Sequence, residues 1–296
     1  MKEQKPQKSF KNGLQASHLA RKIAQSFNRG LAIEGKIETV LNQLREHTGI
    51  KSLSKLDMEH IQAYIDTLAD KVEAKELMNS TVATYISALN DIIRYTQEHS
   101  LTKYEVNTVS AEQYGLNRGS YDYKNRAVDF QTHQNFKEYL QSRDDIQAKA
   151  LTYSVELQRQ FGLRLRESIQ IQKSTIEQAI KTGTLHLTKA DGTKSGRTRD
   201  IPIRTEQQIT TLKKALNFMK ERDLKSLAPV EHIKEQYKYA ENIKSVFNKE
   251  HNGKMDYHGE RHFYAQQRIQ EGASRLEVSE ELGHSREEIT KVYTGA

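Results

Sequence analysis

His258-Gly-Glu-Arg-His262 is the stretch that decides how this sequence of 296 residues is interpreted, because three further patterns accompany it. Before it come Gly162-Leu-Arg-Leu-Arg-Glu167 and, in a turn-rich segment, Lys194. After it comes Leu282-Gly-His284, with Tyr293 nine residues beyond the histidine. Each pattern alone is explained more simply by a surface cation, a helix cap or a half-buried aromatic ring. Their joint occurrence, in this order, favours one catalytic site.

The residue types in these patterns suit the cleavage of a phosphodiester bond without a metal ion. Arginine is permanently charged and binds phosphate oxygens in pairs, so Arg164 and Arg261 are candidates to clamp a phosphate and to stabilise its transition state. A phenol becomes a usable nucleophile when a base or nearby cations activate it, which makes Tyr293 the candidate nucleophile. The histidines can accept protons or donate hydrogen bonds near neutral pH.

Together these motifs resemble the tyrosine recombinase family, which includes phage and mobile-element integrases and Xer-type resolvases. The resemblance covers about residues 150–296. It implies site-specific DNA recombination, in which a strand is cut through a 3′-phosphotyrosine at Tyr293 and then rejoined without metal, cofactor or ATP. The catalytic residues that it implies are Arg164, Lys194, His258, Arg261, His284 and Tyr293, with Glu167 as the acid that holds Arg164 in place.

The resemblance also assigns a role to each of these side chains. Lys194 would be the general acid for the departing 5′ oxygen, and its spacing of eight residues to Pro202 fits the family better than that of Lys189. His258 would accept or orient the Tyr293 proton, and His284 would donate a hydrogen bond to the phosphate. His262, although it completes the R-H pair of the family, is expected to serve local packing.

Hydrophobic periodicity predicts a mainly α-helical chain with a small β-sheet. Four apolar stripes at helical spacing indicate a helical domain over 17–115, preceded by a basic arm over 1–16. The resemblance implies that this helical domain is the DNA core-binding domain of the family. A polar, turn-rich linker over 116–130 leads to an α+β catalytic domain over 131–296. Alternating apolar residues around 184–203 predict a hairpin with a long loop, and Pro202 places its second strand at an edge or near its end. Further local signals predict an N-cap at Asp57, a helix after Ser80, a helical stretch from about Thr132 to Gln160, and capping boxes at Thr205 with Gln208, Ser274 with Glu277 and Ser285 with Glu288.

Composition agrees with a partner that carries negative charge. Lysine plus arginine number 46 against 39 acids, which gives a formal net charge of +7. The candidates for contacts with the DNA backbone are Arg118, Lys124, Arg126, Arg197 and Arg199. The sequence has no cysteine, which excludes disulfides and thiol catalysis. Neither a secretory signal nor an apolar run of membrane-spanning length is present, so we expect a cytoplasmic protein, associated with the nucleoid when it binds DNA.

Three other classes of protein share part of this pattern. A zinc hydrolase would use His258 and His262 as ligands with His284, but its motif needs glutamate where Gly259 stands. A type IB topoisomerase shares the chemistry and relaxes any supercoiled plasmid as a monomer. A non-catalytic, sequence-specific DNA-binding protein would normally have lost one of the catalytic residues, and none is missing here.

The resemblance further implies partners. The expected partners are double-stranded DNA recombination sites, three more copies of the chain in a tetramer on DNA, and an accessory factor that sets direction. Xer-type relatives continue beyond the tyrosine into a helix that docks on a neighbouring subunit. This sequence has three residues after Tyr293, so this helix is absent or placed elsewhere, or the sequence is truncated. Coupling between subunits is then expected to use other surfaces, including the N-terminal helices. The sequence does not identify the DNA target, nor does it separate integration, excision and resolution.

Overall fold

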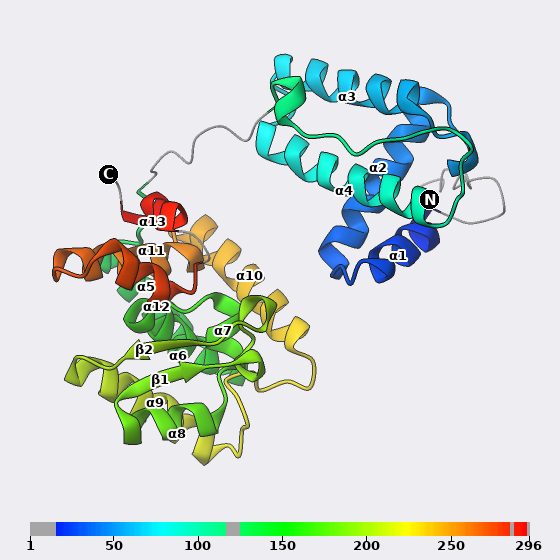
Figure 1. The fold of residues 1–296 in the computed structure, drawn as a ribbon. Helices are drawn as coiled ribbons and strands as arrows, with labels where there is room; N and C mark the ends of the chain where they lie inside the picture. Colours follow the sequence, from blue (N-terminus) through cyan, green and yellow to red (C-terminus); the bar gives the residue numbers. More distant parts are fainter. Residues whose placement is uncertain (1–15, 117–124, 285–286, 295–296) are drawn as a thin grey trace. The chain divides into compact units, whose positions relative to one another are not determined.

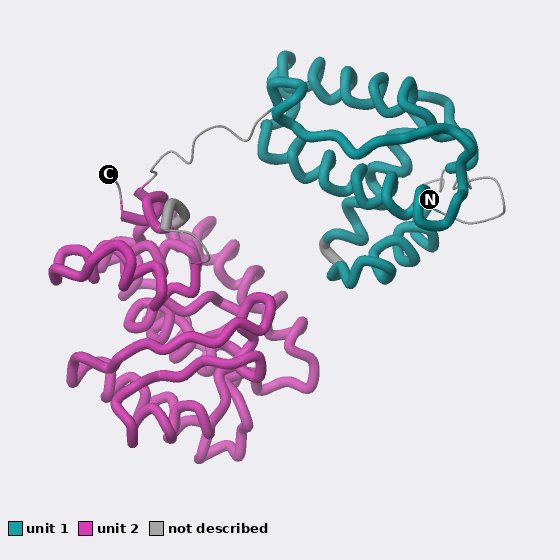
Figure 2. Tube along the Cα trace, viewed as in Figure 1, with its two compact units in different colours: residues 1–120 teal, residues 121–296 magenta. Residues whose placement is uncertain are grey.

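The chain divides into two compact units, unit 1 over residues 1–120 and unit 2 over residues 121–296 (Figure 2). This computed structural model describes residues 16–116, 125–284 and 287–294. Most of the expected arm and the middle of the expected linker lie outside these ranges. The described residues are mainly helical with one two-stranded sheet, which confirms the fold class expected from the sequence (Figure 1).

In its described residues, unit 1 consists of helices whose apolar faces pack into one core. These are α1 (Ala16–Ser26), α2 (Leu31–Thr48), α3 (Met58–Glu73) and α4 (Asn79–Glu98), with the 3-10 turns η1 (Leu53–Lys55) and η2 (Glu112–Tyr114). As the sequence indicates, Asp57 caps α3 by accepting a hydrogen bond from the backbone N–H of His60. Helix α4 begins slightly earlier than the pattern after Ser80 suggests, at Asn79.

Unit 2 surrounds one hairpin with helices. Before the hairpin come α5 (Phe130–Gln141), α6 (Ile146–Phe161), α7 (Leu165–Gln170) and α8 (Lys173–Thr182). The hairpin comprises β1 (Thr184–Leu187), the turns η3 (Lys189–Asp191) and η4 (Lys194–Gly196), and β2 (Arg199–Pro202). After it come α9 (Glu206–Glu221), α10 (Ile233–Glu250), α11 (Tyr257–Gln270), α12 (Arg275–Leu282) and α13 (Glu287–Thr294).

The strands β1 and β2 pair antiparallel, with Leu187 opposite Arg199 and Thr184 opposite Pro202. Leu185, Leu187 and Ile201 point into the core and are fully buried. Helix α8 packs against β1, and α12 packs against β2 (Figure 1). The loop of the hairpin therefore emerges beside the end of α12, which positions it for the site described below.

Helix α6 is the centre of unit 2, because it contributes to two hydrophobic clusters. Phe161 belongs to the cluster around the hairpin, and Val155 belongs to the cluster shared with α5, α7 and α10. The sequence pattern suggests one helical stretch from Thr132 to Gln160, but the structure divides it into α5 and α6. The chain turns between them, and Asp145 caps α6 by accepting from the backbone N–H of Ala148.

Two expected capping boxes are present, and one lies outside the described residues. Thr205 and Gln208 cap α9, and Ser274 and Glu277 cap α12. The third box begins at Ser285, of which the structure says nothing. Within the parts of the chain that are described, no helix combines the length and the apolar character needed to cross a membrane.

Candidate active site

Arg164 stands at the start of α7 because the chain leaves α6 at Gly162. Gly162 has a φ of 62°, a left-handed conformation that glycine adopts at low cost. A Cβ at this position would lie 2.5 Å from the ring of Tyr264, so the close packing between α6 and α11 also requires glycine. After the buried Leu163, the Arg164 side chain is half-buried at the N-cap of α7.

The loop of the hairpin carries Lys194. This lysine begins η4, where Ser195 and Gly196 have left-handed φ angles of 59° and 69°. The turn exposes the Lys194 side chain. Lys189, the other candidate, does not line the cavity that Lys194 lines, and its stem lies near Gly196 instead.

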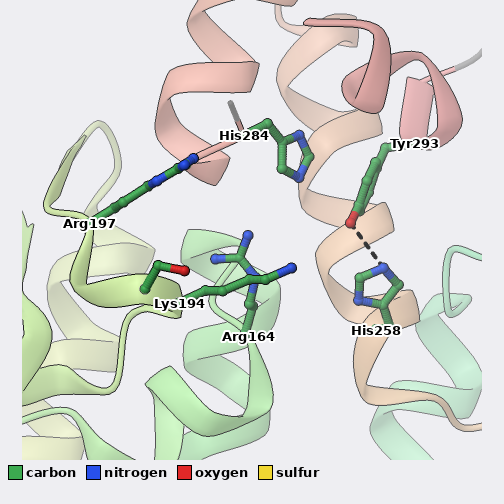
Figure 3. A pocket seen from close by; sticks show the side chains of 8 residues that line it. Arg164, Lys194, Arg197, His258, His284 and Tyr293 are labelled. Atoms are coloured by element: carbon green, nitrogen blue, oxygen red, sulfur yellow. Dashed lines mark hydrogen bonds between the residues drawn. The ribbon is translucent and has the colours of Figure 1, made fainter. Parts of the chain in front are cut away.

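Helices α11 and α13 bring His258 and Tyr293 together. The Tyr293 hydroxyl and His258 Nε2 form a hydrogen bond of 2.9 Å (Figure 3). The ring of His262, one helical turn after His258, stacks on the Tyr293 ring with centroids 4.2 Å apart and planes 22° apart. Tyr293 is 6% exposed, so both its hydroxyl and its ring are held in place.

His284 follows Gly283, whose φ of 63° ends α12. His284 Nδ1 lies 2.9 Å from the hydroxyl oxygen of Thr290, and Nε2 lies 3.2 Å from Arg261 Nη2. Because a guanidinium group only donates, Nε2 accepts this hydrogen bond and Nδ1 carries the proton. The resemblance implies that His284 donates a hydrogen bond to the phosphate. Donation through Nε2 would require a change of tautomer or protonation.

A cavity of about 330 Å³ joins most of the expected catalytic residues. Its lining residues are Arg164, Lys194, Ser195, Arg197, His258, Gly283, His284 and Tyr293. Figure 3 shows the labelled side chains gathered around one space, from the start of α7, the hairpin loop, α11, the end of α12 and α13. Three lining side chains are cationic and two are imidazoles, and none of those described is a carboxylate. Such a surface attracts an anion.

Arg261 is not among the residues that line this cavity. It is fully buried, and its Nη1 and Nη2 groups donate to the backbone carbonyls of Gly162 and Leu282. Its Nε group has no partner among the described atoms. Arg261 therefore joins the end of α6 to the end of α12 behind the cavity, and it also touches His284.

Glu167 binds Arg164, which is the contact that the family resemblance implies. Its carboxylate accepts from Arg164 Nη1 at 2.8 Å and from the Arg164 backbone N–H at 2.7 Å. It also accepts two hydrogen bonds from Arg199, at 2.8 and 2.6 Å. One fully buried acid therefore fixes two guanidinium groups.

The structure corrects the assignment of Arg199 as a contact with the DNA backbone. Arg199 is only 8% exposed, and its two Nη groups are occupied by Glu167. The remaining donor, Nε, is buried and has no partner among the described atoms, so the other edge of the guanidinium group is not open to a phosphate either. Arg199 instead ties β2, and with it the hairpin, to α7.

The other candidates for DNA contacts fall into two groups. Arg197 lines the cavity, and Arg126 is exposed at the start of the second described range. Arg118 and Lys124 lie outside the described residues.

The electrostatics of the site keep its histidines neutral. Burial, together with the charges of Arg261 and Arg164, lowers the pKa of His258 below its usual value of 6.5 and lowers that of His284 to about 3. Burial and the neighbouring His258 lower the pKa of His262 to about 4. Near neutral pH, His258 is therefore an uncharged base beside the Tyr293 hydroxyl.

Sequence reasoning missed several residues of the site. Ser195 and Gly283 line the cavity, and Thr290 is the partner of His284. Only their positions in the sequence could have indicated these residues. Ser195 and Gly283 adjoin candidate residues, and Thr290 lies one helical turn before Tyr293. Among the described residues, no three His, Cys, Asp or Glu side chains converge as a zinc hydrolase would need.

The fold is the one expected from the sequence for a tyrosine recombinase, and the cavity brings together five of the six expected catalytic side chains. The model of the family described as Integrase matches residues 119–267, which is half of the chain. The chain belongs to this integrase family. A comparison with curated proteins finds no match.

Solved structures share the fold at low sequence identity. One is the XerH site-specific recombinase bound to palindromic difH substrate, which is 18% identical with a TM-score of 0.62 over 96% of this chain and 82% of that chain. Another is the Tn1549 transposon integrase with a circular intermediate DNA, at 13% identity and a TM-score of 0.63 over 95% of each chain. A lambda integrase dimer bound to a core site is 14% identical, with a TM-score of 0.60 over 93% of each chain.

Proposed function

We propose that this protein recombines DNA at specific sites, by cutting a strand with Tyr293 and rejoining it through a 3′-phosphotyrosine. The observation that carries the proposal is the 2.9 Å hydrogen bond from Tyr293 to His258 at the edge of a cavity in which no described lining side chain is a carboxylate. A nucleophile paired with a neutral base, next to several cations, is suited to attack on a phosphodiester.

In the cleavage step, the Tyr293 oxygen attacks phosphorus while its proton passes to His258 Nε2. The bond between phosphorus and the 5′ oxygen breaks, and Lys194 donates a proton to the departing oxygen. Arg164 lines the cavity and would bind the non-bridging oxygens, where negative charge develops. We assign Arg261 a place behind these groups, where its charge and its contact with His284 support the same phosphate.

Rejoining is the reverse of cleavage. The free 5′ hydroxyl of a second strand attacks the phosphotyrosine, and Tyr293 leaves with a proton returned from His258. One phosphodiester is broken and one is formed, so the reaction needs no nucleotide as an energy source. Exchange between two sites then depends on which 5′ end attacks.

The solved relatives suggest the partner. XerH, the Tn1549 integrase and the lambda integrase were each captured on DNA sites, and the lambda integrase was captured there as a dimer. We propose that this chain likewise binds duplex recombination sites, as a tetramer when two sites are paired, with an accessory factor setting direction. Its place of action would then be the nucleoid.

Covalent trapping tests the proposal. Wild type and Tyr293→Phe are incubated in EDTA with nicked duplexes tiled across the DNA that flanks the gene in its source genome. We expect a protein–DNA complex that survives denaturing electrophoresis with wild type and not with Tyr293→Phe. Salt-sensitive binding with no covalent complex on any duplex would favour the non-catalytic DNA-binding alternative. Relaxation of a supercoiled plasmid that lacks these sites would favour the topoisomerase.

A further inference from the structure

One face of α11 holds Tyr293 at three points. His258, His262 and Gln266 follow one another at intervals of four residues, so they share this face. His258 bonds the Tyr293 hydroxyl, and His262 stacks on its ring. Gln266 Nε2 donates to the backbone carbonyl of Tyr293 at 3.2 Å. The mechanism above uses the first of these contacts and leaves the third unexplained.

The same amide group of Gln266 reaches a second segment of the chain. Its Nε2 also donates to Asn125 Oδ1 at 3.0 Å, and this oxygen accepts from the Ala127 backbone N–H at 3.1 Å as well. Asn125 opens the second described range, and it follows in the chain from the end of unit 1. One side-chain amide therefore joins the nucleophile to the segment 125–128.

The segment 125–128 is seated closely on α11. The backbone N–H of Val128 donates to the Gly259 carbonyl at 3.3 Å, and the Val128 carbonyl accepts from Arg159 at 3.1 Å. A Cβ on Gly259 would lie 2.4 Å from the Arg126 carbonyl oxygen, so only glycine permits this approach. Arg159 is itself bound to the buried Glu260 at 2.8 Å. These contacts fix Asn125 relative to α11.

Helix α13 needs such anchors. It spans eight residues, and a helix of this length has little stability of its own. The direction of its Tyr293 side chain therefore depends on contacts with α11. A misplacement of about 1 Å in a reacting group can slow catalysis by roughly a hundredfold.

We propose that Gln266 is a positioning residue for Tyr293, with Asn125 as its partner. The packing of segment 125–128 on α11 then helps to set the position of the Tyr293 hydroxyl. The inference rests on the proposed function of Tyr293. Gln266 does not touch the scissile phosphate. Its substitution should therefore slow the covalent step and leave DNA affinity almost unchanged.

The test compares single-turnover formation of the covalent complex on the nicked duplexes described above. Gln266→Glu keeps the shape of the side chain, but it replaces the donating amide nitrogen by a carboxylate oxygen. This oxygen cannot donate to the two acceptors, Asn125 Oδ1 and the Tyr293 carbonyl. At saturating DNA we expect covalent complex to form about 10–100-fold more slowly, with a half-saturating DNA concentration within about twofold of wild type. Gln267→Glu is the matched control, because it adds the same charge on an exposed neighbour, and it should react like wild type.

A second pair of variants separates a hydrogen bond from a general effect on folding. Asn125 is exposed and lies outside any helix, so its substitution does not threaten the core. Asn125→Leu removes the acceptor and should slow the covalent step by about tenfold, whereas Asn125→Asp keeps an acceptor and should restore the rate. Wild-type rates for Gln266→Glu, or equal rates for the two Asn125 variants, would overturn this inference alone. If wild type itself forms no covalent complex, the proposed function fails and this inference fails with it.

Discussion

At the scale of single residues, one buried carboxylate balances the cations of the site. Glu167 is fully buried between Arg164 and Arg199. Burial alone would raise its pKa, but the hydrogen bond and charge of Arg199, with the charge of Arg164, lower the pKa to about 2. The carboxylate is therefore ionised at neutral pH and keeps both guanidinium groups in position.

Replacing Glu167 by Gln should destabilise the fold strongly. The variant leaves Arg199 buried without an opposite charge, and breaking a buried pair in this way costs about 3–5 kcal/mol in the free energy of unfolding. Urea denaturation followed by circular dichroism measures the loss. Glu177→Gln is the control, because the Glu177 side chain is 37% exposed and pairs with Lys220, so its loss should stay below about 1 kcal/mol. Equal losses would contradict the role of Glu167.

The ion pair between Glu167 and Arg199 also makes the free energy of unfolding depend on pH. The folded-state pKa of Glu167 is lowered from 4.5 to about 2. Its contribution to stability is therefore complete above pH 4.5 and declines as the pH falls from 4.5 toward 2. The difference in the free energy of unfolding between wild type and Glu167→Gln should shrink as the pH falls from 4.5 toward 2.

His258 should set the acid limb of the cleavage reaction. Its pKa lies below 6.5 in the folded protein, so the neutral base persists as the pH falls to that value. We expect the rate of covalent complex formation to fall as the pH decreases, with a midpoint below pH 6.5. Rates at DNA concentrations below saturation report the free enzyme, and a midpoint at or above pH 6.5 would count against this assignment.

At this scale the sequence predicted residues whose chemistry is carried by local motifs. The family motif that contains Arg164 also supplied Glu167 as its companion acid, and the other family motifs singled out Tyr293 and His258. Arg199 was misassigned because its partner lies 32 residues earlier in the chain, and no local pattern reports that contact. The tether from Asn125 to Gln266 spans 141 residues and was invisible for the same reason.

At the scale of elements, glycines at helix ends direct the chain into the site. Gly162 ends α6 just before Arg164, and Gly283 ends α12 just before His284. Both have positive φ angles, which let the chain reverse within one residue. Arg164 and His284 therefore project into the site from helix ends.

Gly162→Ala should cost more than the same change at another helix end. Its Cβ would collide with Tyr264 and Leu282, whereas at Gly183, which ends α8 with a φ of 74°, the space is open. We expect Gly183→Ala to lose about 1–2 kcal/mol through backbone strain, and Gly162→Ala to lose about 1–3 kcal/mol more through overpacking. Urea denaturation of both variants gives the difference, and equal losses would remove the packing explanation.

Elements with strong periodicity were predicted well, and their breaks were not. The four helices of unit 1, the hairpin and the capping boxes of α9 and α12 follow from local sequence. The division of α5 from α6 was missed because residues 142–145 contain neither glycine nor proline, and the turn there depends on the cap at Asp145. The buried position of Arg261 was likewise not visible, because it is set by carbonyl groups at the ends of two other helices.

At the scale of the whole molecule, two units with separate cores share one basic chain of net charge +7. Only the family motifs of unit 2 gave the sequence a functional meaning. For unit 1 the sequence predicted helices but no function, because its apolar positions show only which helix faces are buried.

DNA binding should depend steeply on salt. Each phosphate contact releases counterions and contributes about 0.9 to the slope of log affinity against log salt. The double variant Lys194→Ala/Arg197→Ala should therefore reduce this slope by about 1 to 2, because both side chains line the cavity. Fluorescence anisotropy across a salt series measures it, with Lys181→Ala in α8 as a control outside the cavity. An unchanged slope would mean that the cavity does not hold phosphate.

The identity of the residue joined to DNA tests the central claim most directly. Covalent complexes trapped on nicked duplexes are digested with nuclease and with trypsin, which cuts after Lys291 and releases a peptide beginning at Val292. Mass spectrometry of this peptide should find the remaining nucleotide attached through the hydroxyl of Tyr293. A nucleotide attached to any other residue would contradict the account.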